Sequence, residues 1–110
     1  MSPAYVNLEK LRQLSDNDME DAQKLLNLFF DTTCRTLKIL ENNVEENQEE
    51  EWNSALHELK GAAYSLGFFA LGDLCEKAEQ HPVLTSDTKQ IIARNLEQAT
   101  EYIRQATKDL

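Results

Sequence analysis

The strongest constraint on the fold is a run of apolar residues that recurs at the spacing of an α-helix. Counted from Trp52, apolar side chains occur at offsets of 0, 3, 4, 7, 10, 11 and 14, which places them along one side of a helix. Only three glycines and two prolines interrupt the 110 residues, and most segments are rich in strong helix formers. The pattern predicts a helix over about residues 50–66 with one buried face. That face is predicted to consist of Trp52, Ala55, Leu56, Leu59, Ala62, Ala63 and Leu66.

Two helices are predicted before this segment. Leu8, Leu11 and Leu14 lie three residues apart and predict a short helix over residues 7–14. Capping residues at 15–18, followed by acidic residues, predict the start of a second helix that extends to about residue 46. Its inward face is predicted to consist of Ala22, Leu26, Phe29, Thr33, Leu37, Leu40 and Val44, widened by Leu25 and Phe30.

Two more helices are predicted after it. Gly67 is typical of a helix end, and a helix over about residues 69–80 follows, which His81-Pro82 ends. Thr85 or Ser86 is expected to cap the last helix. The predicted inward positions are Leu71, Leu74, Cys75 and Ala78, followed in the last helix by Ile92, Leu96, Ala99, Ile103, Ala106 and Leu110.

These helices, joined by short connections, predict an all-α fold. The expected architecture is an antiparallel four-helix bundle with a short additional N-terminal helix that covers one end. Residues 1–110 suffice for one core but not for two, so a single domain is expected. No apolar run reaches the length of about 18 residues that indicates a membrane span, and the N-terminus lacks a signal-peptide pattern, which favours a cytoplasmic protein. The initiating methionine and compact ends favour a free-standing protein, which is expected to be a monomer.

Charge and composition exclude several functions. The formal net charge of −9 opposes binding to nucleic acid or to anionic membranes, because like charges repel. Cys34 and Cys75 fall near core positions, where thiols act as small buried hydrophobic groups rather than as redox or metal-binding groups. A metal-binding bundle would need Glu-x-x-His spacings, which neither histidine has. No cofactor and no metal are therefore expected.

His57, Lys60 and Gly61 form a polar group on the predicted third helix. At about 100° of rotation per residue, all three lie outside the apolar stripe, so the imidazole of His57 points away from the core. A neutral imidazole is a nucleophile, and Lys60 is placed to donate charge-assisted hydrogen bonds to a phosphoryl group attached to it. A glycine inside a helix costs about 1 kcal/mol relative to alanine, so Gly61 is expected to leave room for that group and for a partner. His81 lacks such neighbours, and we interpret it as structural or exposed at a helix end.

Residues 57–63, with the sequence His-Glu-Leu-Lys-Gly-Ala-Ala, resemble the signature of histidine-containing phosphotransfer (HPt) domains, the helical relays of multistep two-component signalling. The resemblance covers about residues 52–80 at motif level, and chain length and helix order also agree. It implies that His57 accepts a phosphoryl group through Nε2 from a receiver-domain aspartate and passes it to another receiver. It further implies that Lys60 stabilises this group, that Gly61 gives access, and that Glu79 orients the imidazole through Nδ1.

The resemblance implies a phosphocarrier rather than an enzyme. The sequence has no glycine-rich nucleotide-binding loop and no aspartate cluster for magnesium, so self-phosphorylation from ATP is not expected. Magnesium is expected on the partner, a receiver domain of a hybrid sensor kinase or of a response regulator. The alternative function is a helical module that docks a receiver or kinase without being phosphorylated, although such a module would not need the intact histidine, lysine and glycine.

A receiver must dock over the histidine, and four residues are candidates for that surface. Tyr64 and Phe68 are the nearest aromatic residues on or just beyond the same helix. Because Phe68 and Phe69 cannot both point into the core at helical spacing, either one is exposed or both are half-buried at a helix junction. By similarity to the family, Met19 and Gln23 near the start of the second helix are expected to contribute.

Overall fold

The chain folds into a bundle of helices. The computed structural model describes residues 6, 8–45, 47–81 and 84–108. Within these residues the secondary structure consists of helices without strands, as the sequence predicts. The helices are α1 (Glu9–Leu14), α2 (Met19–Glu41), α3 (Glu49–Ser65), α4 (Phe69–Glu79) and α5 (Ser86–Thr107).

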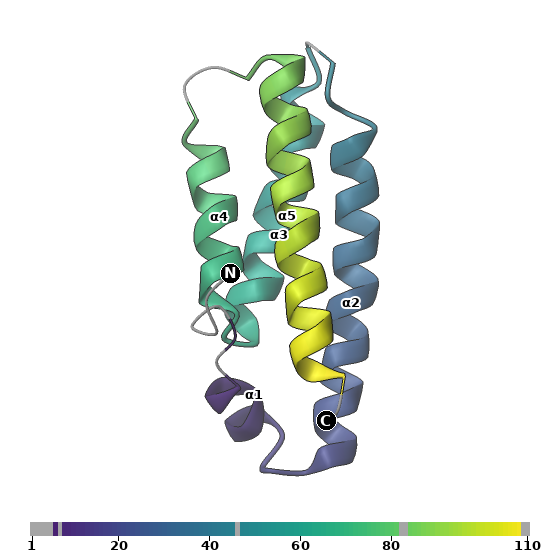
Figure 1. Cartoon of the computed structure of the whole chain (residues 1–110), viewed down its shortest axis with the longest axis vertical. Helices are drawn as coiled ribbons and strands as arrows, with labels where there is room; N and C mark the ends of the chain where they lie inside the picture. Colours follow the sequence, from purple (N-terminus) through teal and green to yellow (C-terminus); the bar gives the residue numbers. More distant parts are fainter. Residues whose placement is uncertain (1–5, 7, 46, 82–83, 109–110) are drawn as a thin grey trace.

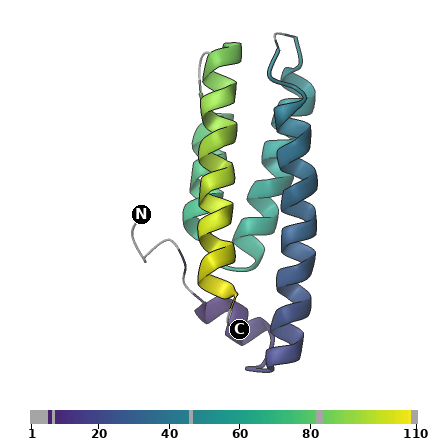
Figure 2. The same cartoon turned by 45° about the vertical axis from the view of Figure 1, so that its right-hand side comes forward.

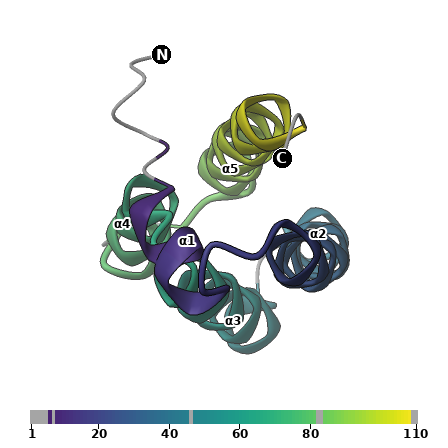
Figure 3. The ribbon, with the colours of Figure 1, turned by 90° about the horizontal axis from the view of Figure 1, so that it is seen from below.

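Four of the helices run side by side, and the short α1 lies at one end (Figure 1). Helices α2 and α5 are the longest two described. Helix α2 reaches the lower end beside α1, whereas α3, α4 and α5 end above it (Figure 2). Seen from below, α1 crosses beneath α3 and α4 (Figure 3). Successive helices from α2 to α5 alternate in direction, so the predicted antiparallel four-helix bundle with an additional N-terminal helix is confirmed.

Side-chain caps fix where the two long helices begin. Asp18 Oδ1 accepts hydrogen bonds from the backbone N–H groups two and three residues ahead, at 2.8 and 3.1 Å. Thr85 Oγ1 accepts a bond from the N–H of Thr88 at 3.1 Å. These bonds satisfy amide groups that have no partner within the helix. Both caps lie among the residues that the sequence offers as candidates.

Helix α1 closes the turn between α3 and α4. Gly67 has a φ of +84°, a left-handed conformation that glycine adopts without strain, and it ends α3 as predicted. The side chain of Lys10 packs against Gly67, and its Nζ donates a hydrogen bond to the carbonyl oxygen of Tyr64 at 2.9 Å. Leu11 is buried beneath the bundle. These contacts fix the lower end of α3 and thereby the register of α3 against α4.

Helix α2 ends at Glu41, earlier than the sequence predicts. The chain beyond it is held in a loop by other bonds, since the side-chain amide of Asn43 donates to the carbonyl oxygen of Ile39 at 2.6 Å. The carbonyl oxygens of Asn43 and Glu45 accept hydrogen bonds from Lys89 instead of continuing a helix. Val44 is therefore a half-buried loop residue rather than a helical core position.

Helix α3 packs between α2 and α4 (Figure 3). Its predicted stripe is buried, except that Ala62 is only half-buried. The predicted inward positions of α2 and α4 are also buried or half-buried. Burial of these apolar side chains is the main source of stability for a helical bundle. The largest fully buried apolar side chains are Trp52, Phe68, Leu11, Leu40, Leu56, Leu59, Leu71, Leu96 and Ile103.

The inward face of α5 differs from the predicted one. Ile92 is half-buried and Ala106 is exposed, whereas the neighbouring Ala93 and Thr107 are buried. Threonine can occupy such positions because its hydroxyl bonds within the helix: Thr107 Oγ1 donates to the carbonyl oxygen of Ile103 at 2.8 Å. Apolar spacing alone therefore missed Ala93 and Thr107 and wrongly placed Ala106 inward, whereas Ile92 does pack against the core. The predicted position Leu110 lies outside the described residues.

The two cysteines have different environments. Cys75 is fully buried, as predicted, and burial raises the pKa of its thiol to about 12. Cys34 is exposed, so its predicted place in the core is wrong. The reason is that α2 turns Thr33 and Thr36 toward the core, and Cys34 lies on the flank between them. The hydroxyl of Thr33 donates to the carbonyl oxygen of Phe29 at 2.7 Å, which makes this burial possible.

A buried lysine connects helix α5 to the loop between α2 and α3. The side chain of Lys89 is fully buried, and its Nζ donates hydrogen bonds to the carbonyl oxygens of Asn43 and Glu45 at 3.2 and 3.0 Å. The same ammonium group lies 3.7 Å from Glu49 Oε1 and 5.4 Å from the ring centroid of Trp52. These contacts offset the cost of removing the charge from water. The apolar pattern does not predict this residue, because lysines are seldom buried.

Candidate functional site

His57 lies on the outer face of α3, at its middle. Its side chain is 76% exposed, so the prediction that the imidazole points away from the core is confirmed. The ring is oriented toward α4, where Nδ1 lies 3.8 Å from Oε1 of Glu79. This separation is slightly longer than a hydrogen bond. A small rotation of the imidazole would bring the two atoms into hydrogen-bond contact and leave Nε2 facing solvent.

Lys60 and Glu79 form an ion pair next to the imidazole. Nζ of Lys60 lies 3.2 Å from each carboxylate oxygen, with hydrogen-bond geometry only toward Oε2. The two side chains are 19% and 23% exposed, which makes this the most protected part of the site. Oε1 is buried and accepts no hydrogen bond within the described residues. This oxygen is the one that faces His57, so it is available to an Nδ1–H group.

Gly61 leaves open space on the same face. A Cβ atom built on this residue would meet no other atom within 4 Å. Close packing of a neighbouring helix therefore does not explain the glycine. Its carbonyl oxygen accepts a hydrogen bond from Ser65 Oγ at 2.7 Å, one turn on. The backbone next to His57 is thus bare and accessible, as the access role predicts.

Tyr64 lies against α4. Its ring occupies the space next to Gly72, where a Cβ atom would clash with three ring atoms. The hydroxyl donates a hydrogen bond to Oδ1 of Asp73 at 2.6 Å and lies 3.4 Å from Oε2 of Glu76. The pKa of the phenol is raised, first by the hydrogen bond to Asp73 and further by burial and by the two negative charges. Its predicted role in docking stays a prediction.

The two phenylalanines at the start of α4 have opposite environments. Phe68 is fully buried and packs on Phe29, with ring centroids 4.9 Å apart. A partner cannot contact a buried ring, so the predicted docking role of Phe68 is wrong. Phe69 is 50% exposed and lies 6.2 Å from the ring of Tyr64. The turn at Gly67 directs the first ring inward and the second outward.

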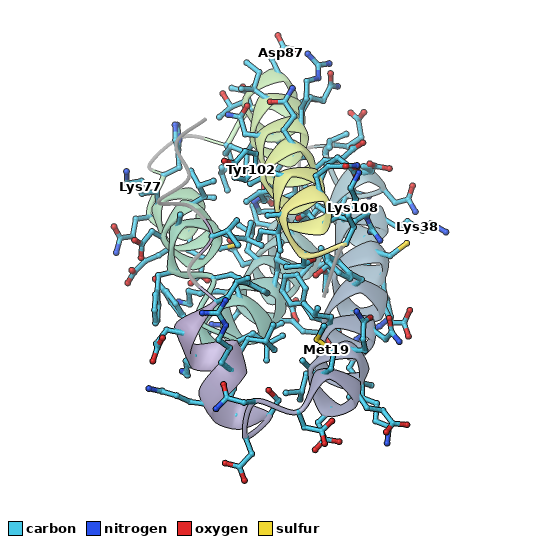
Figure 4. The ribbon with its side chains drawn as sticks, turned by 60° about the horizontal axis from the view of Figure 1, so that its bottom comes forward. Met19, Lys38, Lys77, Asp87, Tyr102 and Lys108 are labelled. Carbon is cyan, nitrogen blue, oxygen red and sulfur yellow. The ribbon has the colours of Figure 1, made fainter. Side chains whose placement is uncertain are left out.

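The other predicted residues lie outside α3, the helix that carries the imidazole. Met19 is 60% exposed on the first turn of α2 (Figure 4), and Gln23 is half-buried one turn later. His81 is exposed just beyond the end of α4. In the described part of the chain, no group of three or more metal-ligating side chains is close enough to hold an ion. The helices described are also too short or too polar to cross a membrane.

The structure adds two features that the sequence analysis missed. Arg35 of α2 binds Glu58 of α3 through two hydrogen bonds of 2.6 and 3.2 Å, and this contact raises the pKa of the guanidinium group.

The second feature is a groove of about 180 Å³ that runs between α2 and α3, below the Arg35–Glu58 pair. Leu28 is 65% exposed there. Leu28 is apolar but lies outside the predicted inward face of α2, and this position could have indicated an exposed apolar surface. The groove residues are Leu25, Leu28, Phe29, Thr32, Ala62, Ser65 and Leu66.

The fold and the site together define a class of protein. It is a helical bundle that presents an imidazole on its surface. The sequence matches the family model of the Hpt domain over residues 24–109. This range includes most of α2, all of α3 to α5 and the four site residues His57, Lys60, Gly61 and Glu79. The chain therefore belongs to the Hpt domain family. Hpt domains are histidine phosphocarriers of phosphorelays and interact with receiver domains. No curated protein and no solved structure matches the chain significantly.

Proposed function

We propose that the chain is an intermediate of a multistep phosphorelay, in which His57 accepts a phosphoryl group from one receiver-domain aspartate and passes it to another. The exposed imidazole beside the Lys60–Glu79 ion pair carries this proposal. The open face at Gly61 gives a partner access to it. The protein acts as a monomeric, cytoplasmic phosphocarrier, and the receiver supplies the magnesium.

The geometry supports attack by Nε2. A hydrogen bond from Nδ1–H to Glu79 would fix the tautomer in which Nε2 carries the lone pair. That lone pair forms the N–P bond, the P–O bond of the aspartyl phosphate breaks, and its electron pair leaves with the aspartate carboxylate. The imidazole ring becomes cationic, which strengthens its bond to Glu79. Lys60 faces the new phosphoryl oxygens with an ammonium group.

The groove between α2 and α3 is the proposed docking surface for the receiver. It is lined mainly by apolar side chains and begins beside Ala62 and Ser65, one to two turns from His57. Leu28 is its most exposed apolar residue. Partly exposed apolar surfaces of this kind are typical of the centre of a protein interface. Met19 and Gln23 do not line this groove and stay separate docking candidates near the start of α2.

We expect Leu28→Glu to weaken binding of a receiver domain by about tenfold, because a charged side chain would replace an apolar anchor. Calorimetric titration of the receiver would measure the change. Ile91→Glu is the matched control, since Ile91 is 57% exposed on α5, away from the groove. Equal affinities of the two variants would show that the receiver docks elsewhere.

Two substitutions of Gly61 test its role in access. Gly61→Ala is expected to raise the free energy of unfolding by about 1 kcal/mol, because alanine favours the helix and the space is empty. Gly61→Leu is expected to slow phosphoryl transfer by about tenfold, because the larger side chain would crowd the imidazole and the partner. Urea denaturation and transfer kinetics would measure the two effects. Ala106→Leu adds the same bulk at an exposed position of α5 and should leave the transfer rate unchanged. Wild-type transfer by Gly61→Leu would contradict the access role.

The proposed function is tested by mixing the protein with a panel of phosphorylated receiver domains and magnesium. Intact-mass analysis is expected to show a gain of one phosphoryl group that is lost in acid, as for an N–P bond. Binding of a receiver without any such gain would favour the alternative, a docking module that is not phosphorylated.

A further inference from the structure

The face of α4 that packs on α3 carries a row of three carboxylates. Asp73, Glu76 and Glu79 are spaced three residues apart, and all three contact α3. Two donors of α3 meet this row, the phenol of Tyr64 and the ammonium group of Lys60, which lie one turn apart. The three carboxylates of α4 therefore outnumber the two hydrogen-bond donors of α3, so each donor has more than one carboxylate as a candidate acceptor.

The register of the two helices makes one pairing unexpected. In an antiparallel pair of helices, the residue number falls along one helix as it rises along the other, so the two numbers of each facing pair add up to nearly the same value. Tyr64 contacts Gly72, which gives a value of 136 for α3 and α4. The same sum places Lys60 opposite Glu76 and His57 opposite Glu79. The ammonium group of Lys60 nevertheless lies 3.2 Å from Glu79, one turn beyond its facing residue.

The hydroxyl of Tyr64 donates its single proton mainly to Asp73 and also reaches Glu76, the carboxylate that faces Lys60. It is 2.6 Å from Asp73 and 3.4 Å from Glu76, and the ring is held in place because Gly72 has no side chain. The raised pKa of the phenol keeps the donor proton in place. Glu76 Oε2 thus contacts the hydroxyl of Tyr64, while the ammonium group of Lys60 contacts Glu79.

We propose that Tyr64 is a positioning residue that holds Glu76, so that Lys60 pairs with Glu79 beside the imidazole of His57. The inference rests on the proposed function, since it assigns a purpose to the Lys60–Glu79 pair in phosphoryl transfer. Without the hydroxyl, Glu76 competes for Lys60 and draws the ammonium group one turn away from His57. Glu79 then faces the incoming phosphoryl group as an unneutralised negative charge.

Tyr64→Phe tests this role because it removes only the hydroxyl and keeps the ring. With a receiver domain phosphorylated by acetyl phosphate, the maximal transfer rate is expected to fall about fivefold, while the receiver concentration at half-maximal rate stays unchanged. Tyr102→Phe on α5 (Figure 4) is the matched control and should transfer at the wild-type rate.

A second substitution separates positioning from a general loss of structure. Adding Glu76→Gln to Tyr64→Phe removes the competing charge and is expected to restore most of the transfer rate. A structural defect caused by the missing hydroxyl would not be repaired in this way. Wild-type transfer by Tyr64→Phe, or failure of Glu76→Gln to restore it, would overturn the proposal.

An NMR measurement decides the pairing without any phosphoryl transfer. The ¹⁵N resonance of the Lys60 ammonium group is expected to shift when Glu79→Gln is introduced into the wild type, and not when it is introduced into Tyr64→Phe. Equal shifts in both backgrounds would overturn the proposal. If His57 takes up no phosphoryl group from any receiver, the proposed function fails, while this measurement still decides the position of Lys60.

Discussion

His57→Gln is expected to abolish phosphoryl transfer and to change the free energy of unfolding by less than about 0.5 kcal/mol. The imidazole is 76% exposed, and its Nδ1 lies 3.8 Å from Oε1 of Glu79. Glutamine fits the same helical position but offers no nitrogen nucleophile. The gain in intact mass after incubation with a phosphorylated receiver would measure transfer, and urea denaturation would measure stability.

The chain offers a matched control in its other histidine. His81 is also exposed, but it lies beyond the end of α4 and, unlike His57, is not followed by a lysine three residues on and a glycine four residues on. His81→Gln should therefore be phosphorylated like the wild type. Two outcomes would contradict the assignment: continued phosphorylation of His57→Gln, or a loss of several kcal/mol in stability, which would make His57 a structural residue.

Lys89→Ala is expected to lower the free energy of unfolding by about 3 kcal/mol. The substitution leaves a cavity under the loop between α2 and α3 and removes the donor for the carbonyl oxygens of Asn43 and Glu45. It also removes the cation beside Trp52. The transfer rate of the folded protein should stay unchanged, because none of these residues lies at the histidine site.

Two further variants divide this effect into its parts. Lys89→Met keeps most of the apolar stem and loses the ammonium group, so a smaller loss of about 1.5 kcal/mol is expected. Lys38→Ala removes an exposed lysine that points away from α2 (Figure 4) and should leave stability nearly unchanged. If Lys89→Ala were as stable as Lys38→Ala in urea denaturation, the buried ammonium group would not hold the loop.

Much of the fold could be predicted because local signals and the final packing agree. The stripe that starts at Trp52 is buried, Asp18 and Thr85 cap their helices, and Gly67 ends α3. These features depend on spacing within one helix. They need no knowledge of which helices become neighbours.

The errors arise where a residue's environment depends on another helix. Lys89 is buried only because carbonyl groups of a distant loop meet its ammonium group, and no pattern within α5 indicates that loop. Phe68 and Phe69 could not be distinguished before the turn at Gly67 was known. The exposed Cys34 has the same origin, since hydroxyls bonded within the helix let threonines take the inward positions.

The same distinction between features within one helix and contacts between helices applies to the candidate site. His57, Lys60 and Gly61 share one helix, so their common face follows from helical geometry. The partners that α4 supplies depend on the register of α3 against α4. That register places Glu79 within reach of Lys60 and brings Tyr64 onto Gly72.

The histidine, lysine and glycine of the site belong to one uninterrupted helix, at a distance from either of its ends. Their mutual placement is therefore fixed by backbone hydrogen bonds before any partner arrives. Association then costs little conformational entropy on this side of the interface, because no loop has to become ordered. A rigid surface of this kind can be recognised in turn by two different proteins, with the structural adaptation made by each of them.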